Sequence, residues 1–88
     1  MDDPRRRKLL YRANHRGFKE ADLILGKFAE QHLAGMSDRE LDAFEQILEI
    51  ADRDLYDWIT DQAPMPAGGD EIMMQRIKDF RPGQGDDA

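Results

Sequence analysis

Residues 37–51 read SDRELDAFEQILEIA and combine a helix start signal with a helical apolar stripe. Ser37 is followed three residues later by Glu40, the spacing of a capping box, in which the serine hydroxyl and the glutamate carboxylate each accept from a free backbone N–H. The segment therefore predicts a helix that begins just after Ser37. Its expected core-facing residues recur at helical spacing and are Leu41, Phe44, Ile47, Leu48 and Ala51.

Two further helices are predicted upstream of this segment. Pro4 suits a first helical position, where its missing N–H costs nothing, so we expect the first helix from about Pro4 to Asn14. The pattern breaks at residues 16–17, and a second helix follows to about His32. The residues expected to face the core from these two helices are Leu9, Leu10, Ala13, Leu23, Ile24, Leu25, Phe28, Ala29 and Leu33.

Two short helices are predicted downstream. Asp52 is the expected N-cap of the fourth helix and Asp70 that of the fifth. Residues 63–69 between them read APMPAGG, which is the composition of a loop, and residues 82–88 are rich in Gly and Asp, which indicates a disordered acidic tail. The apolar residues expected from these helices are Leu55, Trp58, Ile59, Ile72, Met73, Ile77 and Phe80.

The length and the absence of strand patterns indicate one small all-α domain. A chain of 88 residues allows a single domain, and no segment alternates apolar and polar residues over the length of a strand. The sequence contains no Cys, which excludes disulfides, thiolate metal ligands and cysteine nucleophiles. We therefore expect a compact bundle of about five short helices over residues 1–81.

Charge is distributed unevenly along the chain. Residues 1–19 contain seven Lys or Arg and two Asp, a net +5, whereas residues 20–88 carry a net −11. Such asymmetry can orient a protein on a partner of complementary field, and it equally serves solubility. No apolar run reaches the roughly 20 residues that cross a bilayer, and Asp2 and Asp3 argue against a transit peptide. We expect a protein of the bacterial cytoplasm without membrane insertion.

Motifs for catalysis are absent from the sequence. It contains no glycine-rich phosphate loop, no GxSxG and no HExxH. His15 and His32 have no histidine partner at helical spacing, and an imidazolium at His32 would suit the negative end of the second helix. A bundle this small also has little room for a cofactor pocket of roughly 300 Å³ or more. We expect a binding protein rather than an enzyme, without catalytic residues, a metal site or a cofactor of its own.

Residues 16–20, Arg-Gly-Phe-Lys-Glu, break local helix rules and form the first site candidate. Arg16 and Glu20 could pair at i,i+4, but in the less favourable order, and a cation near a helix N-terminus opposes the dipole. Gly17 inside a helix would cost about 1 kcal/mol relative to Ala. Several unfavourable choices together indicate a site. Gly17 either permits close approach of a partner or only separates two helices.

Residues 52–58, Asp-Arg-Asp-Leu-Tyr-Asp-Trp, form the second site candidate. Leu55 and Trp58 share one helix face and are expected in the core. Asp52 and Tyr56 share another face, which could be exposed. A carboxylate beside a phenol suits partner recognition, because Tyr offers a large contact area at a low entropy cost.

Together the two candidate segments resemble a known family. Residues 15–20, HRGFKE, resemble the RGxxE motif of the succinate dehydrogenase flavinylation factors, also called assembly factor 2 or flavinators. Residues 52–59 resemble the Asp-x-Asp-Leu-aromatic-x-Trp motif of the same family, and residues 10–13, LYRA, resemble its bacterial branch. The resemblance covers about residues 7–80.

The resemblance implies a five-helix assembly chaperone. Such a protein binds the flavoprotein subunit of succinate dehydrogenase, and in some bacteria fumarate reductase, and promotes covalent attachment of FAD to a histidine of that subunit. The flavin and the nucleophile would belong to the partner, and we expect the free factor to be a monomer. The implied partner-binding residues are Arg16, Gly17 and Glu20, with His15, Tyr11, Arg12, Asp52 and Tyr56 as their neighbours.

A second class of function stays open. A small helical regulator could bind nucleic acid, or another protein, through basic N-terminal residues, which are Arg5, Arg6, Arg7, Lys8 and Arg12. The acidic body and a pI of about 4.8 oppose binding to nucleic acid. Salt-dependent retention on duplex DNA would distinguish this regulator from the chaperone.

Overall fold

Five α-helices and one short 3-10 turn make up residues 3–80, the part of the chain that the computed structural model describes. The expected all-α bundle is confirmed, and residues 3–80 contain no strand. The expected tail at residues 82–88 lies outside the described part, and a single domain over residues 1–81 stays a prediction. The elements are α1 (Pro4–Asn14), α2 (Lys19–His32), η1 (Leu33–Gly35), α3 (Asp38–Leu48), α4 (Asp52–Ile59) and α5 (Glu71–Asp79).

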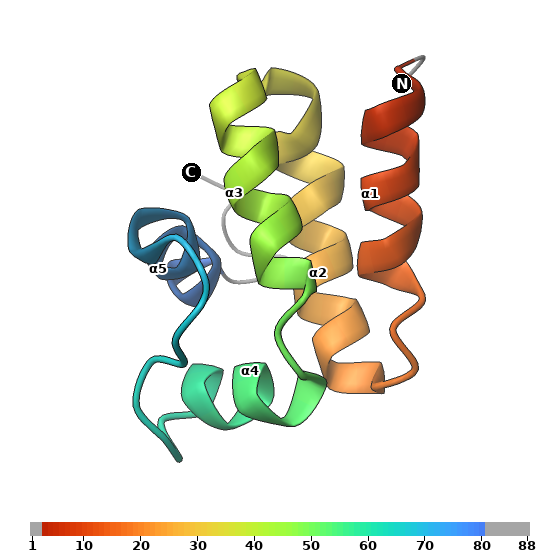
Figure 1. Cartoon of the computed structure of the whole chain (residues 1–88). Helices are drawn as coiled ribbons and strands as arrows, with labels where there is room; N and C mark the ends of the chain where they lie inside the picture. Colours follow the sequence, from red (N-terminus) through yellow and green to blue (C-terminus); the bar gives the residue numbers. More distant parts are fainter. Residues whose placement is uncertain (1–2, 81–88) are drawn as a thin grey trace.

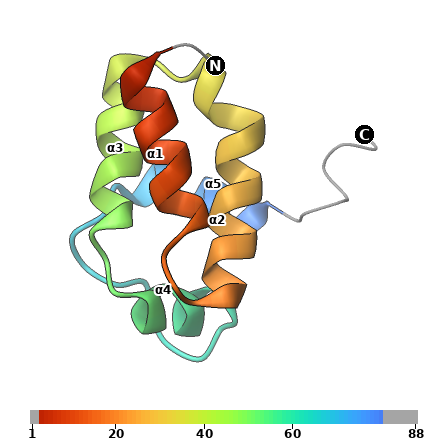
Figure 2. The same ribbon diagram turned by 90° about the vertical axis from the view of Figure 1, so that its right-hand side faces the viewer.

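Three helices run alongside one another and two shorter helices close the bundle (Figure 1). α1 packs on both α2 and α3, and α5 packs on α2 and α3 as well. α4 crosses the lower end of the bundle, and Figure 2 shows α1 in front of α2 and α3 with α4 beneath them. The turn between α1 and α2 and the corner between α3 and α4 therefore lie at the same end. No helix within residues 3–80 has the length and apolar character needed to span a bilayer.

Side-chain caps begin three of the helices. The predicted capping box of α3 is confirmed, since Glu40 N–H donates to Ser37 Oγ at 3.2 Å and Ser37 N–H donates to Glu40 Oε1 at 2.8 Å. Asp70 caps α5 as predicted and accepts from Met73 N–H at 2.8 Å, and Asp3 caps α1. The prediction for α4 was wrong, because Ala51 is its N-cap and has no side-chain oxygen. Asp52 is the first helical residue of α4 instead, and its carboxylate bonds a distant arginine.

The core contains most of the predicted apolar residues, with three exceptions. Leu23 is 54% exposed and Ile72 78% exposed, and Ala51 is exposed as well. On a helix Leu23 lies about 200° from Leu25, so the two residues cannot both face inward. By the same geometry Ile72 faces outward, because the next two residues, Met73 and Met74, are buried. The largest fully buried side chains are Phe28, Phe44, Leu9, Leu25, Leu33, Leu41, Ile47, Leu55, Met74 and Ile77.

Arginines of the basic N-terminal segment bond the rest of the chain. Arg5 Nη2 lies 2.5 Å from Asp42 Oδ1 and 3.0 Å from Glu45 Oε1 on α3. Arg6 donates from Nε to the backbone carbonyl of Leu33 at 2.9 Å, and from Nη2 to that of Met36 at 2.6 Å. The segment is therefore a helix held against an acidic face of α3, and not a separate arm.

His32 lies near the end of α2, but its surroundings disfavour the expected imidazolium. Its ring packs against Phe28, with centroids 4.7 Å apart, and against Phe80 at 6.0 Å. Burial, and to a lesser degree the charge of Arg76, lower the pKa of His32 below its usual value of 6.5. Both effects disfavour the charged ring, so the helix end does not hold the imidazolium that the sequence suggested.

Candidate partner-binding site

An open surface depression of about 280 Å³ lies where the end of α1, the α1–α2 turn and the α3–α4 corner meet. It brings together five of the eight predicted partner-binding residues. Its lining consists of Tyr11, Arg12, His15, Arg16, Leu48 and Asp52. Leu48 was missed as a site residue, because its helical spacing indicates only a core position. The depression is small and open, which suits protein side chains better than an enclosed small molecule.

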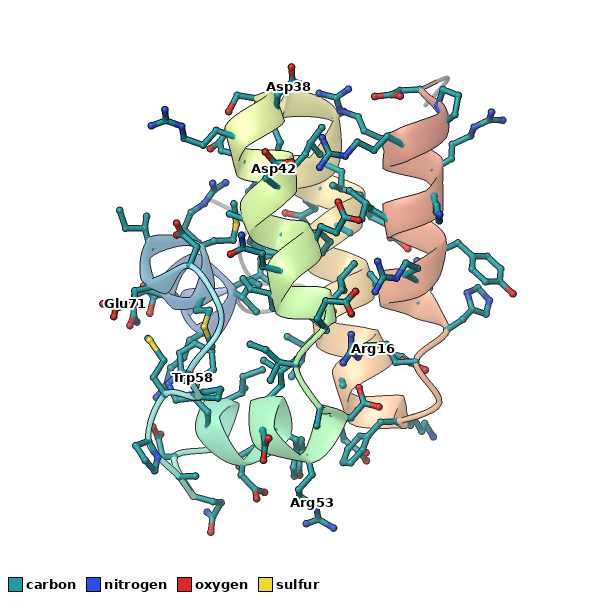
Figure 3. All side chains as sticks on the ribbon, viewed as in Figure 1. Arg16, Asp38, Asp42, Arg53, Trp58 and Glu71 are labelled. Atoms are coloured by element: carbon teal, nitrogen blue, oxygen red, sulfur yellow. The ribbon has the colours of Figure 1, made fainter. Side chains whose placement is uncertain are left out.

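Arg16 forms the inner wall of this depression. Its guanidinium donates from Nε to Asp52 Oδ1, from Nη1 to the carbonyl of Leu48 at 2.8 Å, and from Nη2 to the carbonyl of Ile50 at 2.5 Å. Leu48 ends α3, so the cation also faces the negative end of a helix. The Arg16 side chain is only 10% exposed, and Figure 3 shows it beside the lower end of α3.

The possible i,i+4 pairing of Arg16 with Glu20 does not occur. Arg16 lies in the turn before α2 rather than on a helix, and its charge pairs with Asp52, which is far away in sequence. Glu20 is exposed in the first turn of α2, where a carboxylate suits the helix dipole. No hydrogen bond or ion pair involves the Glu20 side chain within residues 3–80. Its carboxylate is therefore available to a partner.

Gly17 forms the turn between α1 and α2. Its φ is +89°, a conformation that favours glycine, and it is exposed. A Cβ built at Gly17 would meet no heavy atom within 4 Å. The turn therefore accounts for the glycine through backbone conformation, and the open space outside Gly17 leaves its backbone accessible. Close approach by a partner stays a prediction.

Aromatic side chains of α1 and α4 lie near this turn. Tyr11 stacks on His15 with ring centroids 4.0 Å apart, and Tyr11 is 64% exposed. Tyr56 lies outside the depression and is half-buried, with its ring 5.2 Å from that of Phe18 at the start of α2. The exposed face predicted for Tyr56 is thus partly covered. Trp58, in contrast, is 4% exposed and belongs to the core as predicted.

Arg12 is the outermost cation of the depression and is partly neutralised. It donates from Nη2 to Glu49, the C-cap residue of α3, and its Nη1 lies 3.9 Å from Glu45 on α3. Residues 3–80 contain no cluster of three or more His, Asp or Glu placed to hold a metal ion. The site offers an exposed stacked aromatic pair and a carboxylate without a partner, which are groups suited to protein recognition.

Comparisons with known proteins agree with the motif resemblance. A family described as the flavinator of succinate dehydrogenase matches residues 7–81. An FAD assembly factor, SdhE, of Acetobacter pasteurianus is 41% identical over 73 residues, which cover 83% of this chain and 67% of that protein. A mitochondrial succinate dehydrogenase assembly factor 2 of Debaryomyces hansenii is 40% identical over 67 residues, covering 73% of this chain and 47% of that protein.

Another relative extends the match along the chain. The mitochondrial succinate dehydrogenase assembly factor 2 of Candida glabrata is 34% identical over 82 residues, which cover 89% of this chain and 54% of that protein. The chain thus spans about two thirds of the Acetobacter protein and about half of these two yeast proteins. No solved structure gives a significant match. On the match over residues 7–81, the chain belongs to the family described as the flavinator of succinate dehydrogenase.

Proposed function

We propose that this protein is an assembly factor that binds the flavoprotein subunit of succinate dehydrogenase and promotes covalent attachment of FAD to it. The single observation that carries the proposal is the family match over residues 7–81, which includes both candidate motifs. The printed names of its relatives, FAD assembly factor and succinate dehydrogenase assembly factor 2, support the same role. Fumarate reductase is a further candidate client.

The partner-binding surface that we propose is the end of the bundle around the α1–α2 turn. Gly17 and Glu20 are exposed there, and Tyr11 and His15 present a stacked pair beside them. Tyr supplies much contact area with few rotatable bonds, and an unpaired carboxylate can form charge-assisted hydrogen bonds to a partner. Arg12 and Asp52 lie at the same depression and would border the contact.

The flavin is assigned to the client and not to this chain. The depression at the α1–α2 turn is open, as are larger ones of about 420 and 330 Å³ elsewhere on the described surface, whereas a small-molecule site usually encloses most of its ligand. A non-catalytic factor can still accelerate the attachment by binding preferentially to the client conformation in which the histidine and the flavin are aligned. Alignment of two reacting groups contributes up to about 7–11 kcal/mol in favourable intramolecular reactions. We propose that the free factor is a monomer of the bacterial cytoplasm.

Covalent flavin on the client tests this function directly. Cells that lack the protein are complemented with wild type, Glu20→Gln or Glu71→Gln, and in-gel flavin fluorescence of the flavoprotein subunit is measured. Glu71 is the matched control, because it is also exposed in the first turn of a helix, without a hydrogen bond or ion pair within residues 3–80. Figure 3 shows it on α5, away from Arg16.

The expected result is loss of flavin fluorescence without the protein, recovery with wild type and with Glu71→Gln, and poor recovery with Glu20→Gln. Full flavinylation in cells that lack the protein would refute the proposed function. Equal recovery with the two Glu variants would instead remove Glu20 from the contact and leave the function standing.

A further inference from the structure

The three residues that define the RGxxE motif face different environments. Gly17 and Glu20 are exposed, and the Glu20 carboxylate has no partner within residues 3–80. The Arg16 side chain is 10% exposed, and each of its three guanidinium nitrogens already donates to an acceptor of this chain. An arginine that recognises a partner through a bidentate contact needs free donors that point outward. Three of the five guanidinium N–H groups of Arg16 are already engaged and its side chain is nearly buried, so it does not present a free outward-facing fork.

The bonds of Arg16 hold the α1–α2 turn in place from two directions. Its guanidinium reaches the α3–α4 corner, where the acceptors are the carbonyls of Leu48 and Ile50 and the carboxylate of Asp52. Its backbone N–H donates to Asp22 Oδ1 of α2 at 2.8 Å. One residue therefore joins the end of α3, the first residue of α4 and the first turn of α2.

Gly17 and Glu20 follow closely after Arg16, whose bonds we call the Arg16 anchor. Gly17 follows Arg16 in the chain, and α2 begins at Lys19, so Glu20 is in its first turn. The N-cap of α2 is Phe18, which has no side-chain cap bond and is held by its ring contact with Tyr56. With no cap of its own, the start of α2 depends on its neighbours for a fixed direction.

We propose that Arg16 is a positioning residue for partner binding: it fixes the α1–α2 turn against the α3–α4 corner, so that Gly17 and Glu20, rather than Arg16, meet the partner. The proposal rests on the proposed function, whose contact surface it refines. It also explains the residue type, since a guanidinium spreads its donors over three nitrogens of a rigid planar fork and can reach two carbonyls and a carboxylate at separate positions, whereas the donors of a lysine share one nitrogen. A lysine would supply the charge without this geometry.

Binding affinity for the flavoprotein subunit tests the proposal in a double-mutant cycle. Dissociation constants are measured for wild type, Arg16→Gln, Glu20→Gln and the double variant, at a temperature where circular dichroism shows all four folded. If Arg16 positions Glu20, each single variant weakens binding about tenfold or more and the double variant weakens it little further, because the two losses are coupled. Two independent contacts would instead multiply to about a hundredfold.

Arg5→Gln is the matched control for the arginine substitution. Arg5 also joins α1 to carboxylates of α3, but it lies at the other end of the helix from the turn. We expect Arg5→Gln to leave the affinity unchanged and to be additive with Glu20→Gln. Arg16→Lys keeps the charge and is expected to bind as weakly as Arg16→Gln. Full affinity in Arg16→Lys, or additive losses in the cycle with Glu20, would overturn the positioning role.

Amide hydrogen exchange of the free protein supplies a readout that needs no partner. Arg16→Gln should speed exchange of the backbone N–H at position 16, which is bonded to Asp22 Oδ1 in the wild type, and of the N–H of Asp22, which donates to the Phe18 carbonyl at 2.8 Å. Arg5→Gln should not change either rate. If wild type fails to bind the flavoprotein subunit, the proposed function is refuted, while the exchange rates still decide whether Arg16 holds the turn. Unchanged exchange in Arg16→Gln would overturn the proposal.

Discussion

Replacing Asp52 by Ala tests how strongly the Arg16 anchor stabilises the fold. The carboxylate of Asp52 accepts from Arg16 Nε, and the two side chains are 26% and 10% exposed. In the variant the guanidinium keeps its two carbonyl acceptors but loses its counter-charge. Asp54 provides the control, since it lies in the same first turn of α4, is exposed and has no hydrogen bond or ion pair within residues 3–80.

The magnitude follows from the burial of the pair. Removing one partner of a fully buried ion pair costs about 3–5 kcal/mol, and losing a hydrogen bond to a charged group costs about 1.5–3 kcal/mol. Because Asp52 keeps partial contact with water, we expect Asp52→Ala to lower the free energy of unfolding by about 2–3 kcal/mol. Asp54→Ala loses only its interaction with the helix dipole, about 0.3–1 kcal/mol.

Thermal and urea unfolding, followed by circular dichroism at 222 nm, measure both variants. For a domain of this size each kcal/mol shifts the midpoint by about 4–8 °C, so Asp52→Ala should lower it by about 8–24 °C. Arg16→Gln introduced into Asp52→Ala should cost less than Arg16→Gln in wild type, since the shared bond is already gone. A loss for Asp52→Ala that is no larger than for Asp54→Ala would refute the reasoning.

Three further predictions follow from single positions. His32→Gln should reduce the fall in stability between pH 7.5 and 5.5. Because the pKa of His32 is lowered in the folded protein, the unfolded chain binds the proton more readily, and the free energy of unfolding falls as the pH drops through about 6.5. Urea unfolding at a series of pH values measures this. Gly17→Ala should cost about 1–2 kcal/mol through its positive φ, measured by the same unfolding assay at pH 7. Ile72→Gln should change the free energy of unfolding by less than about 0.5 kcal/mol, because the side chain is 78% exposed; calorimetry would show a large drop in midpoint if Ile72 were a core residue.

Local patterns predicted the helices well because local chemistry forms them. The first helix was expected at Pro4–Asn14, which are its bounds in the structure. The box of Ser37 and Glu40 is formed by groups three residues apart, so the sequence alone could indicate it. Leu23 and Ile72 failed because an apolar residue in a run of apolar residues does not reveal which face of the helix packs.

The candidate site could be predicted in membership but not in geometry. Five of the eight residues line one depression, yet Glu20 was the only partner within the chain considered for Arg16, and its actual partner is Asp52. A local spacing rule considers residues three or four apart, whereas Asp52 is 36 positions from Arg16. That contact depends on α1, α2 and α3 packing together, which brings the α1–α2 turn to the start of α4.

Arg16 and Glu20, the opposite charges of the segment that resembles the RGxxE motif, therefore have different surroundings. The guanidinium of Arg16 satisfies carbonyls that the end of α3 would otherwise leave without donors, and it compensates a half-buried carboxylate. The carboxylate of Glu20 compensates nothing within residues 3–80 and gains only from the helix dipole. Three bonds to separate acceptors fix the guanidinium of Arg16 and with it the direction of the α1–α2 turn, whereas the carboxylate of Glu20 is left exposed. Substitutions of Arg16 should accordingly change both stability and affinity, whereas Glu20→Gln should lower the affinity and cost at most its interaction with the helix dipole, about 0.3–1 kcal/mol.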